Sequence, residues 1–293
     1  MSEMNYDLII LGGGPAGLAA GIYGGRARLK TLIIEKGTIG GRAETTREIL
    51  NYPGVLETTG PDLTDSMRRH AEKFGVTIVQ ESPKDVVLEG ETKVVKTRKN
   101  TYTAPAIIIS TGTSARILGI PGEKEFAGAG VAYCATCDAE FFKDQRVCVI
   151  GSGDQAIEES MFIAKFATEV TIIVLHEEGV LDCNKVAAQK AFAHPKLKFV
   201  WNSVVKEIKG ENLVTTVVLE NVKTGEVSEL SVNGVFPYIG ISPNVELFNG
   251  QLQQDSKGFI ITDDTMATSV EGVFAVGDVR NTPLRQVITA ASD

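Results

Sequence analysis

The sequence of 293 residues has little of what would direct it to a membrane or to nucleic acid. No apolar run approaches the ~20 residues that a membrane-spanning helix requires, and the first residues lack the basic and apolar regions of a signal peptide. A formal net charge of −8 provides no basic face for nucleic acid or for an anionic membrane. We therefore expect a cytoplasmic protein that binds neither.

Cysteine and histidine are also scarce, with four and three residues. Four cysteines do not make a disulfide framework, and the histidines show no metal-ligand spacing. Cys134 and Cys137 are spaced C-x-x-C, which could be half of a zinc site, but no second C-x-x-C exists, and Cys148 and Cys183 are isolated. The sequence therefore favours a dithiol without a metal. A redox role suits this dithiol, because a helix N-terminus lowers a thiol pKa and favours the reactive thiolate.

Glycine, by contrast, is frequent, and two groups of glycines have the spacing of nucleotide-binding turns. An apolar run at 6–11 leads into the first group, and an apolar helix start at 18–23 follows it. In the G-x-G-x-x-G pattern the glycines permit a tight turn, close approach to a pyrophosphate and close helix–strand packing. The predicted binding residues are Gly12, Gly14, Pro15, Ala16 and Gly17.

The apolar run at 31–34 ends at Glu35, whose carboxylate can accept both ribose hydroxyls of an adenosine. Two later segments point to FAD as the nucleotide. A strand at 106–110 ends in Thr111 and Gly112, where the chain can leave one domain for another. A strand at 272–276 is followed by Gly277 and Asp278. Asp278 could hydrogen-bond the flavin ribitol or cap a helix, and the two roles are compatible.

A second strand–glycine–helix pattern begins at the apolar run 147–150. Its binding residues would be Gly151, Gly153 and Ala156, the last a tolerated replacement for glycine, and the next strand lies at 169–174. This duplication predicts an α/β fold with two Rossmann-like, three-layer dinucleotide-binding domains.

The segment after this second pattern is acidic. A pocket for the 2′-phosphate of NADP needs arginines, whereas the sequence has Glu177, Glu178 and Asp182. NADPH is therefore disfavoured. Glu177 or Glu178 could accept the ribose 2′-hydroxyl of NADH, or both could be solvated loop charges, because the strand ends near the apolar Val174.

Taken together, the motifs resemble those of the low-molecular-weight thioredoxin reductases over nearly the whole chain. The matching segments are 12–17 (GGGPAG), 51–54 (NYPG), 110–115 (STGTSA), 134–138 (CATCD), 151–156 (GSGDQA), 277–278 (GD) and 285–287 (RQV). The resemblance implies a homodimer with a discontinuous FAD domain, residues 1–115 and 242–293, into which a dithiol and pyridine-nucleotide-binding-like domain, residues 116–241, is inserted.

The resemblance also implies roles for individual residues. Cys137 would face the flavin, Cys134 would attack the partner disulfide, and Asp138 would act as general acid–base, with helix capping as its structural alternative. Arg285, Gln286 and Val287 would lie along the isoalloxazine ring, and Asn51 would reach it from the other side.

We thus expect an enzyme that passes electrons through FAD to the Cys134–Cys137 dithiol and on to a thioredoxin-like protein. Two alternatives keep the flavin and the dithiol but change the donor, to NADH or to reduced ferredoxin. A third, from another class, is a non-catalytic flavin-binding redox sensor.

Overall fold

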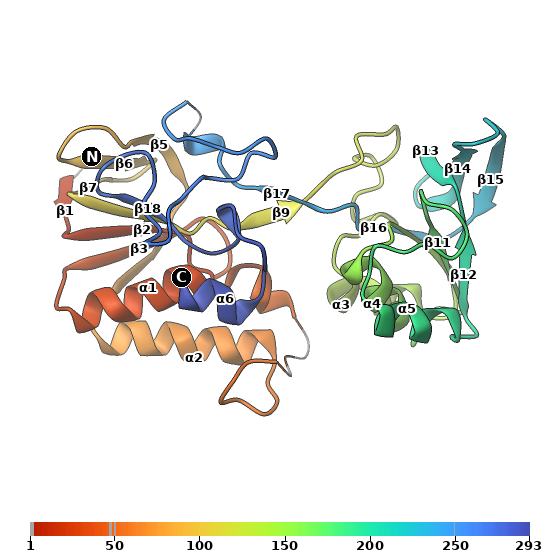
Figure 1. Ribbon diagram of the computed structural model, residues 1–293, viewed down its shortest axis with the longest axis horizontal. Helices are drawn as coiled ribbons and strands as arrows, with labels where there is room; N and C mark the ends of the chain where they lie inside the picture. The colour runs from red at the N-terminus through yellow and green to blue at the C-terminus, as the bar shows by residue number, and fades with distance from the viewer. Residues whose placement is uncertain (1–2, 47–48, 50, 249) are drawn as a thin grey trace. The chain divides into compact units, whose positions relative to one another are not determined.

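The computed structural model describes residues 3–46, 49, 51–248 and 250–293, without the side chains of Glu3, Thr136 and Cys137. The chain divides into two compact units. Unit 1 contains Met1–Ser114 and Ser242–Asp293, and unit 2 contains Ala115–Ile241 (Figure 1). The two connecting segments pair with each other as β9 (Thr113–Ala115) and β17 (Ile241–Pro243).

Unit 1 is built around a five-stranded parallel sheet in the order β18-β8-β2-β3-β4. Its strands are β2 (Leu8–Leu11), β3 (Thr31–Glu35), β4 (Thr77–Gln80), β8 (Ala106–Ile109) and β18 (Val273–Ala275). Alternate side chains of a strand point to opposite faces, and in β2 both faces are buried. Ile9 and Leu11 pack in one core cluster, and Leu8 and Ile10 pack in another.

Each face of this sheet is covered by a different layer. Helices α1 (Pro15–Arg26), α2 (Gly60–Lys73) and α6 (Val287–Ser292) lie on one face (Figure 1). A four-stranded sheet lies on the other, in the order β1 (Glu3–Asn5), β7 (Thr101–Ala104), β6 (Lys93–Thr97) and β5 (Pro83–Val87). Short 3₁₀ helices η1 (Gly41–Thr45), η3 (Glu246–Phe248) and η4 (Gly277–Val279) complete the unit.

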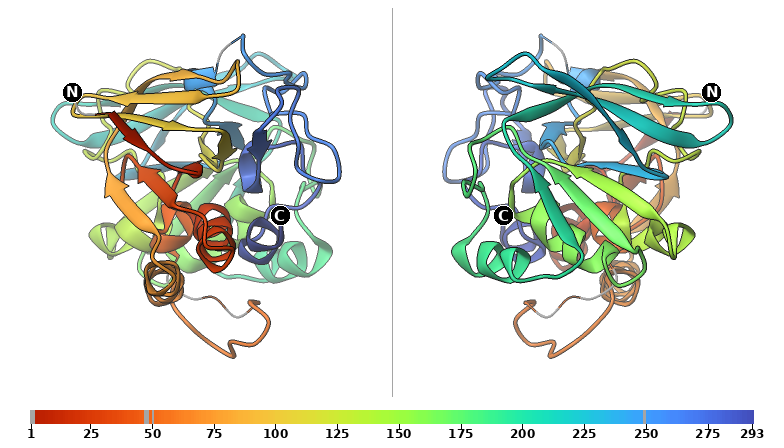
Figure 2. Two further views of the ribbon diagram at one scale, coloured as in Figure 1. Left: turned by 90° about the vertical axis from the view of Figure 1, so that its left-hand side faces the viewer. Right: turned by 90° about the vertical axis from the view of Figure 1, so that its right-hand side faces the viewer.

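Unit 2 repeats this plan on a smaller scale. Its parallel sheet has the order β12-β11-β10-β16, with β10 (Arg146–Ile150), β11 (Glu169–Ile173), β12 (Leu197–Val200) and β16 (Gly234–Pro237). Helices α3 (Ala135–Asp138), α4 (Asp154–Ile163) and α5 (Lys185–Phe192) and the 3₁₀ helix η2 (Ala139–Phe142) accompany it. The antiparallel strands β13 (Ser203–Gly210), β14 (Val214–Asn221) and β15 (Val227–Ser231) form the third layer (Figure 2, right).

The predicted α/β class is confirmed, since each unit places a parallel sheet between helices and a second sheet. This second sheet is antiparallel in unit 2 and mixed in unit 1, where β1 pairs with β7 in parallel. The duplication also holds residue by residue in the central strands. In β10, Val147 and Val149 pack in the cluster that holds the helices, whereas Cys148 and Ile150 pack in the cluster of the antiparallel sheet. Over the described residues, the helices are too short or too polar to cross a membrane.

Candidate functional site

The first glycine turn joins β2 to α1 and accepts only glycine at two of its positions. Gly12 has φ +114°, and a Cβ there would lie 2.3 Å from the Ser110 carbonyl oxygen. A Cβ on Gly17 would lie 2.0 Å from the carbonyl oxygen of Gly12. Gly14, which caps α1, has its nearest neighbour for such an atom 4.0 Å away. The turn is therefore tightly packed inside and open where the unpaired amides of α1 point outward.

Glu35 ends β3 beside this turn. Its Oε2 accepts a hydrogen bond from the Gly13 N–H at 2.7 Å, and its Oε1 accepts one from the Gly37 N–H at 2.6 Å. Both carboxylate oxygens are thus held in place by backbone donors. Each oxygen keeps a lone pair with which it can accept a further hydroxyl, as a ribose requires.

Asp278 lies in η4, close to the same turn, because Gly277 has φ +72° and packs against Ala16. Burial raises the pKa of the Asp278 carboxyl, although Arg285 and Arg42 act in the opposite direction. Its side chain caps neither η4 nor α6, whose N-caps are Val276 and Gln286. The capping role that the sequence allowed for Asp278 is therefore wrong.

The residues predicted to lie along the isoalloxazine ring come together at the start of α6. Gln286 forms a capping box with Thr289, and its Oε1 accepts a hydrogen bond from Asn51 Nδ2 at 2.9 Å. The Arg285 guanidinium stacks 4.1 Å from the centroid of Phe259. Val287 packs against the core cluster between the parallel sheet and the helices.

Two residues at the crossing between the units were not predicted. Thr111 Oγ1 donates to the carbonyl oxygen of Asn244 at 2.7 Å, and Asn244 Nδ2 donates back to the Thr111 carbonyl oxygen at 2.8 Å. The Asn244 N–H also donates to the carbonyl oxygen of Gly112 at 3.0 Å, and Gly112 has φ +63°. Arg42, the second missed residue, donates to Thr113 Oγ1 at 3.1 Å. Arg42 lies in η1 and Asn244 lies between β17 and η3, and neither segment carries a sequence motif.

Unit 1 therefore offers the groups that an FAD molecule needs. The open helix N-terminus suits a pyrophosphate, and the fixed Glu35 carboxylate suits a ribose. Asp278 is a half-buried carboxyl that caps no helix, which suits the predicted hydrogen bond to the flavin ribitol. These features fit the cofactor that the sequence predicts.

The dithiol lies in unit 2, at the start of α3. Cys134 is half-buried and disulfide-bonded, whereas Cys148 and Cys183 are free thiols. The Cys137 side chain lies outside the described residues, so its predicted direction toward the flavin stays a prediction. The Ala135 N–H donates to the hydroxyl of Tyr238 at 3.0 Å, which anchors the first turn of α3 to the end of β16.

Asp138, at the end of α3, is half-buried, and burial raises the pKa of its carboxyl. Asp138 is the N-cap residue of η2, yet its side chain makes no capping hydrogen bond. Capping of α3, the helix that carries Cys137, is the structural alternative to the acid–base role of Asp138, and both roles stay predictions. Burial raises the pKa of the Tyr238 hydroxyl, and the negative charges of Glu159 in α4 and of Asp138 raise it further. Burial also raises the pKa of Glu159. Tyr238 and Glu159 were not predicted from the sequence, because neither is a glycine or cysteine of a motif.

The second glycine turn reproduces the first. Gly151 has φ +129°, and a Cβ there would lie 2.2 Å from the carbonyl oxygen of Tyr238. Gly153 caps α4 and has nothing within 4 Å of such an atom. Ala156 is buried at the foot of the helix, where it approaches Gly151. This turn, too, leaves an open helix N-terminus.

The acidic segment after β11 does not behave as one group. Glu177 is exposed and pairs with Lys223, whose ammonium lies 2.6 Å from its carboxylate. Glu178 is exposed as well. Asp182 contacts the glycine turn instead, where its Oδ2 accepts a hydrogen bond from Ser152 Oγ at 2.7 Å and lies 2.7 Å from His176 Nε2.

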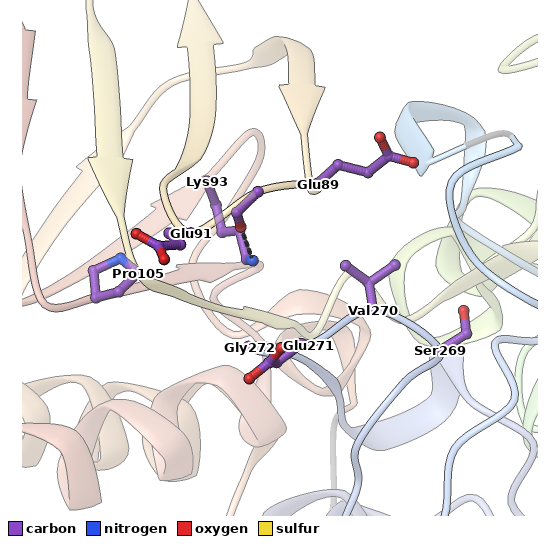
Figure 3. Close-up of a pocket in the computed structure, with 9 residues that line it drawn as sticks. Glu89, Glu91, Lys93, Pro105, Ser269, Val270, Glu271 and Gly272 are labelled. Carbon is purple, nitrogen blue, oxygen red and sulfur yellow. Dashed lines mark hydrogen bonds between the residues drawn. The ribbon is translucent and has the colours of Figure 1, made fainter.

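A pocket of about 670 Å³ in unit 1 is separate from all these residues. Two loops, 89–91 and 269–272, line it together with Lys93 and Pro105 (Figure 3). Lys93 is buried, and its ammonium donates to the Gly90 carbonyl oxygen. No residue predicted for FAD, for the dithiol or for the second nucleotide lines this pocket.

Residues 6–293 match the family model described as pyridine nucleotide-disulphide oxidoreductase. A thioredoxin reductase of Peptoclostridium acidaminophilum is 49% identical to the chain over 298 residues, which cover 99% of this chain and 94% of that protein. The crystal structure of Lactococcus lactis thioredoxin reductase superposes with a TM-score of 0.93 at 42% identity, over 98% and 95% of the two chains. A ferredoxin-flavin thioredoxin reductase of Clostridium acetobutylicum is more distant, with a TM-score of 0.52, 26% identity and coverage of 99% and 94%.

Proposed function

Because the chain belongs to the low-molecular-weight thioredoxin reductases, FAD-dependent oxidoreductases that act on disulfides, we propose that it reduces a thioredoxin-like protein through its Cys134 disulfide and draws its electrons from NADH. The observation that carries the proposal is the redox centre of unit 2. Cys134 forms a half-buried disulfide four residues before Asp138, a carboxyl with a raised pKa that makes no capping hydrogen bond to η2. The same unit contains the second nucleotide-binding turn.

The protein residues have distinct tasks in this proposal. FAD, when bound, would supply the two-electron transfer that links the nicotinamide to the disulfide. The thiolate of reduced Cys134 attacks one sulfur of the partner disulfide and displaces the other as a thiolate. Cys137 then attacks the mixed disulfide at Cys134, which restores the enzyme disulfide and leaves the partner with two thiols. Asp138 exchanges the proton that accompanies reduction of the enzyme disulfide.

The choice of NADH rests on charge. The segment that should meet a 2′-phosphate carries Glu177, Glu178 and Asp182, and like charges disfavour NADPH at that place. Ferredoxin as donor, a homodimer and a cytoplasmic location remain predictions from the sequence. The match to a ferredoxin-flavin enzyme supports the first of these only through a distant relative.

Anaerobic spectroscopy of the FAD-loaded protein tests the donor. NADH should bleach the flavin absorbance, whereas NADPH should do so far more slowly. Bleaching by reduced ferredoxin alone would replace NADH with ferredoxin, and efficient bleaching by NADPH would refute the charge argument.

Thioredoxin turnover tests the disulfide. Cys134→Ser should lose turnover while it keeps FAD, since exchange needs both sulfurs. Cys183→Ser, which alters a free thiol, is the matched control and should retain turnover. Thioredoxin reduction by the Cys134→Ser protein would overturn the proposal.

A further inference from the structure

The two nucleotide-binding turns can be aligned through their backbone hydrogen bonds alone. The Gly12 N–H donates to the carbonyl oxygen of Ile34 at 2.9 Å, and the Gly151 N–H donates to that of Ile173 at 3.1 Å. Ile34 and Ile173 are therefore equivalent. The next residue in unit 1 is Glu35, and the next residue in unit 2 is Val174.

Val174 cannot do what Glu35 does. Its side chain is apolar and buried, with 0% exposure. A ribose-binding acid usually lies at the end of the second strand. In unit 2 the apolar Val174 takes this position.

A second pair of bonds shows where a carboxylate enters instead. In unit 1 the returning chain donates from the Gly40 N–H to the Gly13 carbonyl oxygen at 2.8 Å. In unit 2 the equivalent bond runs from the Asp182 N–H to the Ser152 carbonyl oxygen at 2.9 Å. Gly40 has no side chain, whereas Asp182 brings a carboxylate to the same residue of the turn that Glu35 contacts in unit 1.

The Asp182 carboxylate is fixed but still available. Its Oδ2 accepts the Ser152 hydroxyl and lies next to His176 Nε2, and these contacts hold its pKa below the usual range. Its side chain is nevertheless 60% exposed, and no hydrogen bond occupies Oδ1 among the described residues. Glu177, in contrast, is committed to Lys223.

We infer that Asp182 is the residue that selects the nucleotide of the second site, by accepting the 2′-hydroxyl of an adenosine ribose without a 2′-phosphate. The acid has moved from the strand end to the returning loop while its position at the glycine turn is kept. The same carboxylate would repel a 2′-phosphate. The inference rests on the proposed NADH dependence and names the residue responsible for it.

Calorimetric titration of the oxidised, FAD-loaded protein tests the inference without turnover. The probes are ADP-ribose, its 2′-deoxy analogue and its 2′-phosphorylated analogue. The unmodified protein should bind ADP-ribose at least about 10-fold more tightly than either analogue, because a hydrogen bond to a charged acceptor is lost or replaced by repulsion.

Asp182→Ala should lower the affinity for ADP-ribose about 10- to 100-fold. The variant should bind ADP-ribose and its 2′-deoxy analogue with equal affinity, because the group that accepts the 2′-hydroxyl is gone. Asp182→Asn, which keeps an oxygen acceptor for Ser152, controls for local collapse and should retain part of the discrimination. Glu211→Ala, an exposed acid in the turn between β13 and β14, should leave all three affinities unchanged.

The inference is overturned if Asp182→Ala still distinguishes ADP-ribose from its 2′-deoxy analogue. It is also overturned if that variant binds ADP-ribose more tightly, since Asp182 would then cover the turn. An unmodified protein that binds none of the probes would overturn it too. The proposed disulfide reduction is judged separately, by thioredoxin reduction after dithionite has reduced the flavin, so the two failures cannot be confused.

Discussion

The two units hold their nucleotide turns with the same backbone geometry but with different side chains. In unit 1, the Gly40 N–H donates to the Gly13 carbonyl oxygen, and the Glu35 carboxylate accepts hydrogen bonds from the N–H groups of Gly13 and Gly37. In unit 2, the corresponding loop is joined by Ser152 and Asp182, and Asp154 Oδ1 also accepts both donors of Asn184. The loop of unit 2 is thus fastened by charged and polar side chains at its surface.

This difference matches what the two sites would do. A rigid turn suits a cofactor that stays bound. A loop that is held by exposed hydrogen bonds suits a nucleotide that must bind and dissociate in each turnover. Exposed hydrogen-bonded carboxylates contribute little to stability, so such a loop opens at small cost. Unit 2 also carries the disulfide, close to a helix whose Glu159 has a raised pKa.

The largest expected effects come from the glycines that the two turns share. Gly12→Ala would drive a Cβ into a carbonyl oxygen at a positive φ, and we expect FAD affinity to fall about 100-fold or more. Gly151→Ala has the same conflict, but should leave FAD bound and abolish flavin reduction by NADH. Flavin absorbance after gel filtration measures the first, and anaerobic bleaching measures the second.

Gly225→Ala is the control for these variants. It also has a positive φ, but nothing lies within 4 Å of the added atom, so it reports backbone strain alone. If Gly151→Ala released FAD, or if Gly12→Ala kept it, the division of cofactors between the units would be wrong.

The next effect concerns Asp138. Asp138→Asn removes the exchangeable proton and should slow reduction of the disulfide about 10²- to 10⁴-fold. Burial raises the pKa of Asp138, so its protonated form persists to higher pH than that of an ordinary aspartate. The rate in the unmodified protein should therefore fall as the pH rises through this raised pKa. Stopped-flow traces over a range of pH should show this limb, and Asp138→Asn should lack it.

Thermal unfolding separates this role from a structural one. An aspartate with a raised pKa in the folded state contributes stability that is complete below its unfolded pKa and is lost as the pH rises through the folded value. Asp138→Asn should therefore be at least as stable as the unmodified protein near neutral pH. A lower melting temperature with an unchanged rate would instead show a structural residue.

A smaller effect should follow from reversing charge beside the second turn. Glu177→Arg with Glu178→Arg should shift the preference of flavin reduction toward NADPH by about 10-fold, because arginine binds phosphate in a bidentate manner. The double variant Glu211→Arg with Glu226→Arg changes the net charge equally at exposed positions of the same unit. If both double variants shifted the preference alike, the effect would be long-range and the local argument would fail.

Sequence patterns predicted the architecture well because both units repeat the same short-range rule. A buried strand, a glycine turn and a helix recur at Gly12 and Gly151, and the conflicts of a Cβ at these positions show why glycine is required. The cysteine spacing likewise singled out Cys134, which is disulfide-bonded in the structure.

The groups around the sites were harder to predict because they meet only in the folded chain. Tyr238 reaches Ala135 across more than a hundred residues, and Asn244 reaches Thr111 in the same manner. The sequence also pointed to Glu177 and Glu178 for the ribose, since they lie nearest to the strand end. Glu177 contacts Lys223 instead, and the carboxylate at the turn belongs to Asp182, later in the loop.

The smallest expected effect tests whether the equivalence of the central strands extends to chemistry. Cys148 in β10 occupies the place of Ile9 in β2, and both side chains have 0% exposure. Burial raises the pKa of the Cys148 thiol to about 12, so at about pH 8 almost none of it is thiolate. Iodoacetamide should therefore label the half-exposed Cys183 of the folded, oxidised protein, slowly because its pKa is also raised, and leave Cys148 unlabelled. Mass spectrometry of peptides reads both sites, and unfolding in urea should make them react alike. Equal labelling in the folded protein would show that β10 is less closed than β2.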